Sequence, residues 1–295
     1  MLSILIPTYK YTVYNLVCEL KKQCDIAGIE YEIICQDDHS DSLMNIDNLK
    51  INHLENCTFI SNSENLGRAK NRNLLAQKAK FPYLLFLDAD TFPINKNFIS
   101  NYILEINDVN KIVYGGIRYQ EKQPPKEKLL RWVYGKKREA LTVEQRNKNI
   151  YLSFLTLNFL IHKEVFITVS FNESIPNLRH EDTLFSYELM KNNISLKHIE
   201  NPIYHFGIDN FDKALQKEHE SLLALKNLLD NNLLPADYVK ISRLYTIIEN
   251  LKAKFLVVFT FKIVKPVLLK NISGANPSLL LFDIYRVGYI CSIKK

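Results

Sequence analysis

Residues 83–90 read Tyr-Leu-Leu-Phe-Leu-Asp-Ala-Asp, a short apolar run followed at once by two aspartates that flank an alanine. Such a run is typical of a strand that is buried on both faces of a sheet. Similar runs span 3–7, 31–36, 57–61 and 111–117, and amphipathic helical segments span 12–24, 66–80 and 97–106. Strands that alternate with helices predict an α/β domain whose central sheet is mostly parallel and covered by helices.

Polar residues follow these strands at the points where they end. They are Pro7-Thr8-Tyr9, Asp37-Asp38-His39-Ser40, Asn62-Ser63 and Asp88-Ala89-Asp90. Ligands of open α/β sheets bind in the crevice beyond the carboxyl ends of the strands. Four carboxylates at one edge repel one another unless a cation or hydrogen-bond donors stabilise them. We therefore expect a binding crevice at this edge of the sheet.

The central motif is Asp88-Ala89-Asp90. Two acidic side chains at the tip of a buried strand can bind a hard divalent cation, which can in turn bind diphosphate oxygens. Most Asp-x-Asp sequences are turns or solvated loops, so the motif alone is weak. Its position directly after a hydrophobic strand favours the metal hypothesis.

Two further segments each allow two interpretations. Asp37 and Asp38 either cap a following helix or recognise a nucleotide base or ribose. The segment 65–73, Asn-Leu-Gly-Arg-Ala-Lys-Asn-Arg-Asn, opens the helical stretch 66–80. Its basic residues either face solvent or contact phosphate or ribose at the helix start.

The ordered set of motifs resembles the family-2 glycosyltransferases, which have the GT-A fold, a nucleotide-binding α/β domain. The resemblance covers residues 1–206 and depends on order and spacing, because no single motif is specific. It implies that Asp37 or Asp38 holds the base or ribose, that Asp90 binds Mn²⁺ or Mg²⁺, and that Asp88 touches the metal or the donor. The donor-binding residues implied are Pro7, Thr8, Tyr9, Asp37, Asp38, Asn65, Gly67, Arg72, Asp88 and Ala89. Two departures from the family pattern are His39 and Leu74, which stand where glycine is usual.

The second half of the chain resembles the acceptor side of the same family. Segments 158–163 and 171–173 are similar to the approach to its catalytic helix, and Glu181-Asp182 to its Glu-Asp motif. The resemblance makes Asp182 the general base and gives Glu181 a positioning role. Two acidic residues that merely complement a helix dipole would produce the same pattern. His205 is the third expected metal ligand, beside Asp88 and Asp90, although a lone histidine is more often structural; His198 and His180 are weaker candidates.

The predicted division of the chain is a GT-A domain at 1–210 and a helical extension at 211–295. Within the domain, 1–118 form the nucleotide-sugar-binding half and 119–210 the acceptor half. The basic, irregular segment 120–149 is either a solvated loop with a surface helix or a mobile lid over an anionic donor. The five scattered cysteines indicate reduced thiols, and no export signal is visible, so we expect a cytoplasmic protein.

The whole charge excess lies in the extension. Residues 211–295 hold 13 Lys and Arg against seven Asp and Glu, which leaves 25 of each in residues 1–210. The apolar run 255–269, which Pro266 kinks or ends, is either a core or oligomer helix or a helix at an anionic membrane surface. We favour peripheral contact with the inner face of the cytoplasmic membrane, because lipid-linked acceptors lie there.

The expected activity is that of an inverting, metal-dependent glycosyltransferase that acts in bacterial surface-polysaccharide synthesis. Its expected partners are a nucleotide-sugar donor, UDP-linked by family frequency, and a glycan or lipid-linked acceptor; no nucleic acid is expected. A catalytically silent sugar-nucleotide or glycan-binding subunit is the alternative from another class. A nucleotidyltransferase is less consistent with the sequence, because 7–11 contain no glycine-rich phosphate loop.

Overall fold

The computed structural model describes residues 1–108, 111–175 and 179–294, and its chain forms two compact units. The first unit contains 1–118, 181–207 and the described part of 140–177. The second contains 119–139, 179–180 and 208–294.

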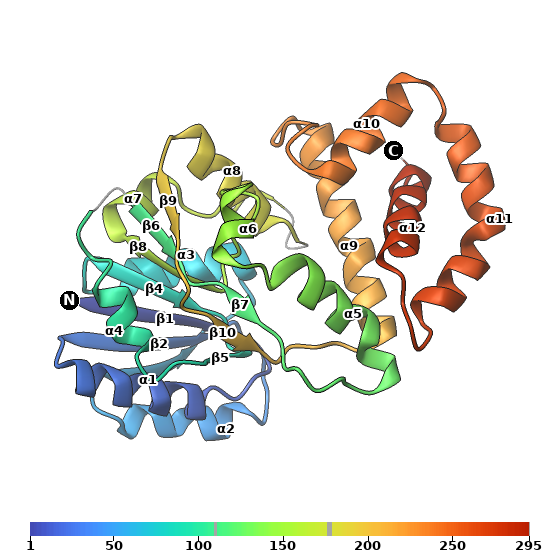
Figure 1. Ribbon diagram of the computed structural model, residues 1–295. Coiled ribbons are helices and arrows are strands. Elements are labelled where there is room, and N and C mark those ends of the chain that lie inside the picture. The colour runs from blue at the N-terminus through green and yellow to red at the C-terminus, as the bar shows by residue number, and fades with distance from the viewer. Residues whose placement is uncertain (109–110, 176–178, 295) are drawn as a thin grey trace. The chain divides into compact units, whose positions relative to one another are not determined.

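The first unit is built on a mostly parallel sheet, which confirms the predicted fold class (Figure 1). Among the described residues its seven strands are, in spatial order, β3 (Cys57–Ser61), β2 (Tyr31–Asp37), β1 (Leu2–Thr8), β4 (Tyr83–Leu87), β8 (Asn158–His162), β6 (Lys111–Tyr114) and β9 (Ser195–His198). Strands β3, β2, β1 and β4 are parallel neighbours, whereas β8 runs antiparallel to β4 and β6. The carboxyl ends of β1, β2 and β3 meet, because Thr8 pairs with Asp37 and Asp37 with Ser61.

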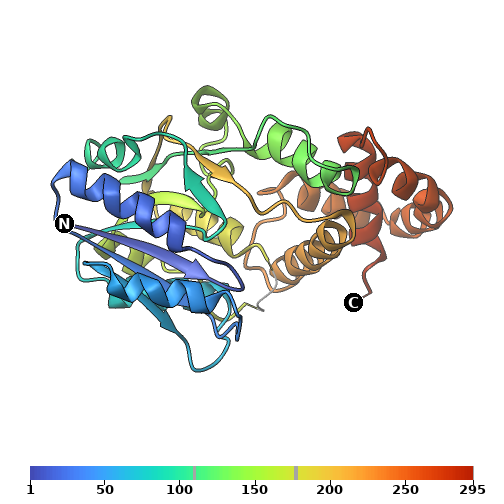
Figure 2. The same ribbon diagram turned by 90° about the horizontal axis from the view of Figure 1, so that it is seen from below.

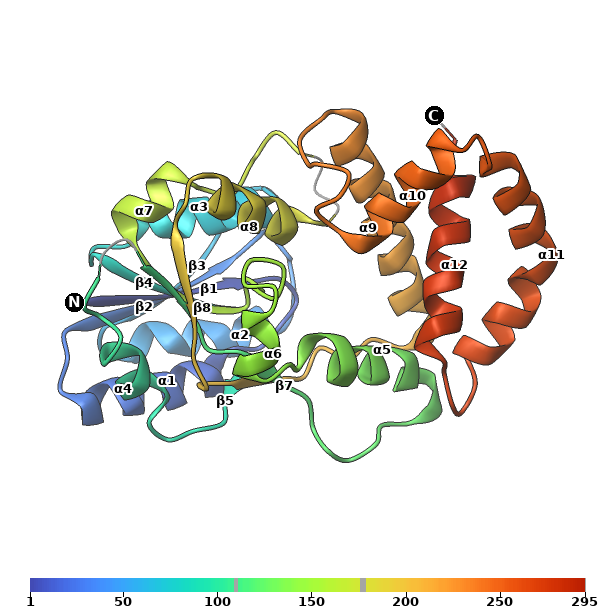
Figure 3. The ribbon, with the colours of Figure 1, turned by 45° about the horizontal axis from the view of Figure 1, so that its top comes forward.

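Both faces of this sheet are buried because its strands are apolar on both sides. Ile4 and Ile6 belong to one hydrophobic core, whereas Leu5 between them belongs to the other. Helices α1 (Tyr14–Ala27) and α4 (Phe98–Ile103) cover the first face. Helices α3 (Arg68–Lys78), α7 (Lys163–Thr168) and α8 (Glu181–Lys191) cover the second (Figure 3). A strand with period-two alternation between two apolar cores is what a doubly covered sheet requires.

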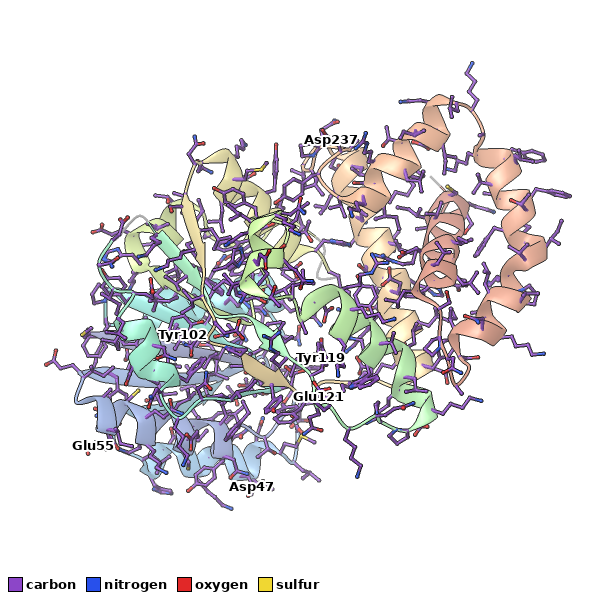
Figure 4. The ribbon with its side chains drawn as sticks, viewed as in Figure 1. Asp47, Glu55, Tyr102, Tyr119, Glu121 and Asp237 are labelled. Carbon is purple, nitrogen blue, oxygen red and sulfur yellow. The ribbon has the colours of Figure 1, made fainter. Side chains whose placement is uncertain are left out.

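The predicted strand at 111–117 is interrupted in the structure. Strand β6 ends at Tyr114, and Ile117–Arg118 form β7 in a second sheet after Gly115 and Gly116. A side chain at 115 would overlap the carbonyl oxygen of Asn201 and the hydroxyl of Tyr102, a buried residue of α4 that is labelled in Figure 4. Gly116 has a φ of +91°, which L side chains rarely adopt. The two glycines therefore allow the chain to leave one sheet and enter the other.

The second sheet is small and positions one predicted site residue. Strand β10 (Ile203–His205) lies between β5 (Thr91–Pro93) and β7. The antiparallel register of β10 and β5 places His205 opposite Thr91. The loop after β4 and the end of β10 thus come together, although over a hundred residues separate them in sequence.

Part of the basic segment 120–149 packs into the first unit. The side chain of Arg146, from α6 (Val143–Asn147), is 1% exposed and donates to the carbonyl oxygens of Tyr114 at 3.2 Å and Ile199 at 2.9 Å. Its guanidinium also lies 5.0 Å above the ring of Tyr114. Residues 119–139 belong to the second unit instead, where they form η2 (Lys126–Lys128), α5 (Leu129–Tyr134) and the π-helical η3 (Gly135–Glu139). The lid function of 120–139 remains a prediction.

The second unit is helical, as predicted for the C-terminal extension. Its long helices are α9 (Phe211–Asp230), α10 (Lys240–Asn250), α11 (Lys254–Ile272) and α12 (Leu279–Ser292). Figure 2 shows these helices, orange to red, clustered with the green 119–139 segment. Gly288 of α12 lies against the ring of Phe261, and no Cβ would fit between them. Helix α11 continues through Pro266, so this proline is not the helix end that the sequence allowed.

Among the described helices, none combines the length and the hydropathy that a bilayer crossing requires.

Candidate active site

The carboxylate of Asp37 is buried and accepts hydrogen bonds from the residues of the turn that follows it. It accepts hydrogen bonds from the backbone N–H of Ser40 at 2.8 Å, from the Ser40 hydroxyl at 2.6 Å and from Asn45 at 3.1 Å. His39 between them has a φ of +54°, in the left-handed region where the family's usual glycine has no steric penalty. His39 therefore occupies a backbone conformation that glycine adopts without strain.

Asp38 holds the start of helix α3. Its carboxylate oxygens accept from the backbone N–H groups of Leu66 and Gly67, both at 2.8 Å, and from the Asn62 amide at 3.0 Å. The Asn65 amide donates to the Asp38 carbonyl oxygen at 2.9 Å, and Gly67 has a φ of +82°. A carboxylate at a helix N-terminus also interacts favourably with the helix dipole. The structure thus joins the predicted donor residues Asp38, Asn65 and Gly67 into one rigid loop.

Arg72 of α3 lies between the Asp88-Ala89-Asp90 motif and the start of α8. Its Nη2 donates to Asp88 Oδ1 at 2.8 Å, and its Nη1 lies 3.4 Å from Glu181 Oε1. The side chain is 6% exposed, and its guanidinium lies 5.4 Å above the Phe171 ring. Burial alone would lower the pKa of Arg72, but the carboxylates of Asp88, Glu181 and Asp182 raise it. A permanent buried cation therefore links the two acidic motifs.

Asn73, next to Arg72, fixes the segment that leads to α8. Its side-chain oxygen accepts from the Phe171 N–H at 3.0 Å, and its amide donates to the Phe171 carbonyl and to Glu173, both at 2.8 Å. The Asn73 side chain thus bonds both backbone polar groups of Phe171 and also the Glu173 carboxylate. The sequence places Asn73 only at the end of the basic 65–73 segment, because its partner Phe171 lies 98 residues away.

Asp90, the second aspartate of the Asp88-Ala89-Asp90 motif, lies beside His205. His205 Nε2 lies 3.2 Å from Asp90 Oδ2, and the backbone N–H of Phe206 donates to the Asp90 carbonyl at 2.8 Å. Gly207 lies directly against this pair, since a Cβ there would overlap Asp90 Oδ2 and approach His205 Nε2 to 3.1 Å. Burial and the nearby Asp90 carboxylate raise the pKa of Tyr11, so its hydroxyl stays neutral beside the motif. Sequence reasoning missed Gly207 and Tyr11; the scarcity of glycine, eight in 295 residues, was the available signal for the first.

Asp182 lies in the first turn of α8, where the motif placed it. Its Oδ1 accepts from the backbone N–H of Thr183 at 2.7 Å. Glu181 beside it is 12% exposed and faces two arginines, Arg72 at 3.4 Å and Arg68 at 3.7 Å. Glu181 thus pairs with two arginines, and the Asp182 carboxylate both accepts from its own helix start and acts on the charge of Arg72.

The remaining predicted donor residues lie at the tip of β1 and in the motif itself. Thr8 is buried and donates to the Ile6 carbonyl at 3.2 Å, Pro7 is half-buried, and Tyr9 is exposed. Ala89 packs against the core that lies beneath α1. Leu74, the second departure from the family pattern, lies within α3 and leaves that helix intact.

The two weaker histidine candidates, His198 and His180, have structural partners. His198 is buried, with Nε2 2.9 Å from the Ile150 carbonyl and Nδ1 3.4 Å from Arg146, and burial lowers its pKa to about 4. His180 Nε2 lies 2.9 Å from the Ser221 hydroxyl within the second unit.

Among the described residues, no group of three or more His, Cys, Asp or Glu side chains is arranged to hold a metal ion. The side chains of Asp88, Asp90 and His205 nevertheless fit a divalent cation by their chemistry. Carboxylate oxygen and imidazole nitrogen both bind Mn²⁺, and carboxylate oxygen binds Mg²⁺.

A parallel sheet with an Asp-x-Asp loop at its carboxyl edge and a Glu-Asp helix opposite defines the GT-A class of nucleotide-diphospho-sugar transferases. Residues 3–170 match the family model "Glycosyl transferase family 2", which covers more than half of the chain. The chain belongs to glycosyltransferase family 2.

The chain also resembles one protein described as a glycosyltransferase and shares its fold with solved structures. A Haemophilus influenzae protein described as an uncharacterized glycosyltransferase is 26% identical over 197 residues, which cover 65% of this chain and 72% of that one. The Staphylococcus aureus TarS 1–349 complex with UDP-GlcNAc has a similar fold, with a TM-score of 0.53 and 18% identity over 77% of this chain and 66% of that chain. The TarS complex with UDP has a TM-score of 0.52 and 17% identity over 98% of this chain and 89% of that one. The chain thus spans just under two thirds of the first TarS structure's length.

Proposed function

We propose that the chain is an inverting glycosyltransferase that moves a sugar from a nucleotide-diphosphate sugar to a hydroxyl group of a glycan or lipid-linked acceptor. The TarS structures of similar fold contain UDP-GlcNAc and UDP, which supports a UDP-linked donor. Bacterial cell-surface polysaccharide synthesis is the setting that we propose for this activity.

The observation that carries the proposal is the position of Arg72. It holds Asp88 on the donor side and Glu181 on the acceptor side with one guanidinium. Transfer requires the donor's anomeric carbon and the acceptor hydroxyl to be brought together in a fixed orientation. A buried arginine that joins the two motifs supplies such an orientation without itself reacting.

On the donor side, we propose that Asp90 and His205 hold Mn²⁺ or Mg²⁺. Asp88 is a third potential ligand through the carboxylate oxygen that does not accept from Arg72 Nη2. When bound, a divalent cation would neutralise negative charge on the departing nucleoside diphosphate. The carboxylates of Asp37 and Asp38 already accept hydrogen bonds from the chain itself. We therefore propose that these two residues hold in place the loops that contact the base and ribose.

On the acceptor side, we propose that Asp182 is the general base. A hydroxyl is a poor nucleophile until a carboxylate within hydrogen-bond reach takes its proton, which contributes about 10²–10⁴-fold. The proton moves from the acceptor oxygen to Asp182 as that oxygen attacks the anomeric carbon and the bond to the diphosphate breaks. A single displacement of this kind inverts the anomeric configuration. Glu181, paired with Arg72 and Arg68, orients the start of α8.

The alternative, a silent sugar-nucleotide-binding subunit, shares the donor half of this proposal. The two candidates differ only in whether bound donor is consumed. Hydrolysis or transfer that requires Asp90 and Asp182 supports the enzyme, whereas binding without turnover over a full acceptor panel supports the subunit.

The donor half can be tested by a thermal-shift screen of nucleotide sugars with and without Mn²⁺. A ligand that binds the native state raises its melting temperature, so the true donor should stabilise the protein and should do so more strongly with metal. Asp90→Ala should remove the metal-dependent part of the shift. Glu55→Ala, a substitution at an exposed loop residue labelled in Figure 4, is the control and should keep it. A shift of equal size in Asp90→Ala would contradict the metal assignment.

A further inference from the structure

Helix α11 of the second unit presents an apolar stripe to solvent. Phe255, Phe259, Ile263 and Val267 recur every four residues, from 54% exposed at Phe259 to 83% at Phe255. Leu256 beside them is 61% exposed. At 1.5 Å per residue the stripe is about 18 Å long. Its opposite face, with Phe261, Leu268 and Ile272, already packs into the core of the second unit. Both faces of the helix are therefore apolar, and only one is covered.

Contiguous apolar surface of this kind marks a site of interaction with a partner or a membrane. The charges around the stripe indicate whether it contacts a partner protein or a membrane. Lys262 lies on the same exposed face, and Lys252 and Lys270 are exposed just before the first turn and in the last turn of α11. From Leu251 to Phe282 the sequence contains no Asp or Glu.

We propose that the α11 stripe (Phe255, Leu256, Phe259, Ile263 and Val267) docks on the surface of a membrane that contains anionic lipid. The helix would lie in the plane of the interface, with the stripe among the upper acyl chains and the lysines at the headgroups. Long lysine side chains reach headgroups while their methylene stems remain in apolar surroundings.

A second copy of this chain fits the same surface less well. A symmetric dimer would place the stripe and its lysines against the same stripe and lysines of the partner. Like charges that face each other across an interface oppose association, and no acidic side chain lies within this stretch to offset them. Anionic headgroups supply the opposite charge. This inference concerns the second unit alone and does not rest on the proposed catalytic residues.

The test is flotation of the full chain with vesicles of equal parts phosphatidylcholine and phosphatidylglycerol at low salt. The wild-type protein should float with these vesicles and much less with phosphatidylcholine alone. Phe255→Ser combined with Phe259→Ser should lower the partition coefficient roughly tenfold or more. Replacing Lys252, Lys262 and Lys270 by Gln should lower it about fivefold per lysine and reduce its salt dependence.

The matched control is Leu43→Ser combined with Leu104→Ser, two similarly exposed leucines of the first unit, which should leave flotation unchanged. Every substituted side chain is exposed, so we expect all variants to fold, and melting curves check this. The proposal is overturned if the wild-type protein does not float, or if the stripe variant floats as well as the control. It is equally overturned if sedimentation shows a dimer that the stripe variant loses while flotation is unchanged.

Discussion

Arg72 Nη2 donates to Asp88 Oδ1 at 2.8 Å, across only 16 residues of sequence. The same guanidinium lies 3.4 Å from Glu181, which is 109 residues away. One buried cation therefore fixes the distance between the loop after β4 and the first turn of α8. These two elements carry the acidic motifs of the proposed donor and acceptor sides.

Arg72→Ala should destabilise the first unit by about 3 kcal/mol, because it leaves two carboxylates without their buried counter-charge. Asp88 is partly exposed, so we expect the lower end of the usual range for breaking a buried ion pair. Urea unfolding measures the change. Arg68→Ala is the matched control, since Arg68 is half-exposed and 3.7 Å from Glu181, and it should change stability by less than about 1 kcal/mol. Equal effects of the two substitutions would show that Arg72 has no special structural role.

Gly207→Ala tests the Asp90–His205 pair without removing either side chain. The new methyl group would overlap Asp90 Oδ2 and should turn that carboxylate away from His205. We expect UDP affinity in Mn²⁺ to fall at least about tenfold, while stability changes by roughly 1 kcal/mol or less, because a short side chain can rotate. Calorimetric titration of UDP with and without Mn²⁺ measures the affinity under each condition. Unchanged affinity with metal would place the metal site elsewhere.

Local sequence patterns predicted the sheet and the positions of the acidic motifs. The run at 83–87 forms β4, and Asp88 and Asp90 follow it as expected, because a buried strand and its end depend on nearby residues. The prediction at 111–117 was wrong, since a continuous apolar pattern hides the change of sheet at Gly115 and Gly116.

Long-range relationships within the site could not be predicted in the same way. The pairing of Arg72 with Glu181 and the register that places His205 opposite Thr91 arise from tertiary packing. The basic composition of 120–149 indicated either a solvated segment or a lid, but Arg146 is buried because carbonyl oxygens and the Tyr114 ring surround its guanidinium. Charge predicts exposure only where such partners are absent.

His198 should make the stability of the first unit depend on pH. Its pKa is lowered to about 4 in the folded chain, from an ordinary value near 6.5 in the unfolded one. The unfolded state therefore binds more protons between these values, so this contribution is complete above pH 6.5 and is lost as the pH falls toward 4. The loss amounts to about 3 kcal/mol at pH 4.

Urea unfolding of the wild-type chain and His198→Gln across this pH range measures the effect. The variant cannot titrate at this position, so its stability should fall less steeply between pH 6.5 and 4. Parallel pH profiles of the two proteins would mean that other groups produce the dependence.

The most direct measurement of the proposed chemistry is a transfer assay on Asp182→Asn and Glu181→Gln, with nucleotide binding measured on the same samples. Asp182→Asn keeps the shape of the side chain and should bind donor normally, but its kcat should fall by about two to four orders of magnitude. Its rate profile should also lose the acidic limb, because no carboxylate remains to be deprotonated. Glu181→Gln should raise the acceptor KM more than it lowers kcat. Near-normal kcat in Asp182→Asn with an inactive Glu181→Gln would move the base to Glu181, and full activity in both variants would contradict the catalytic account.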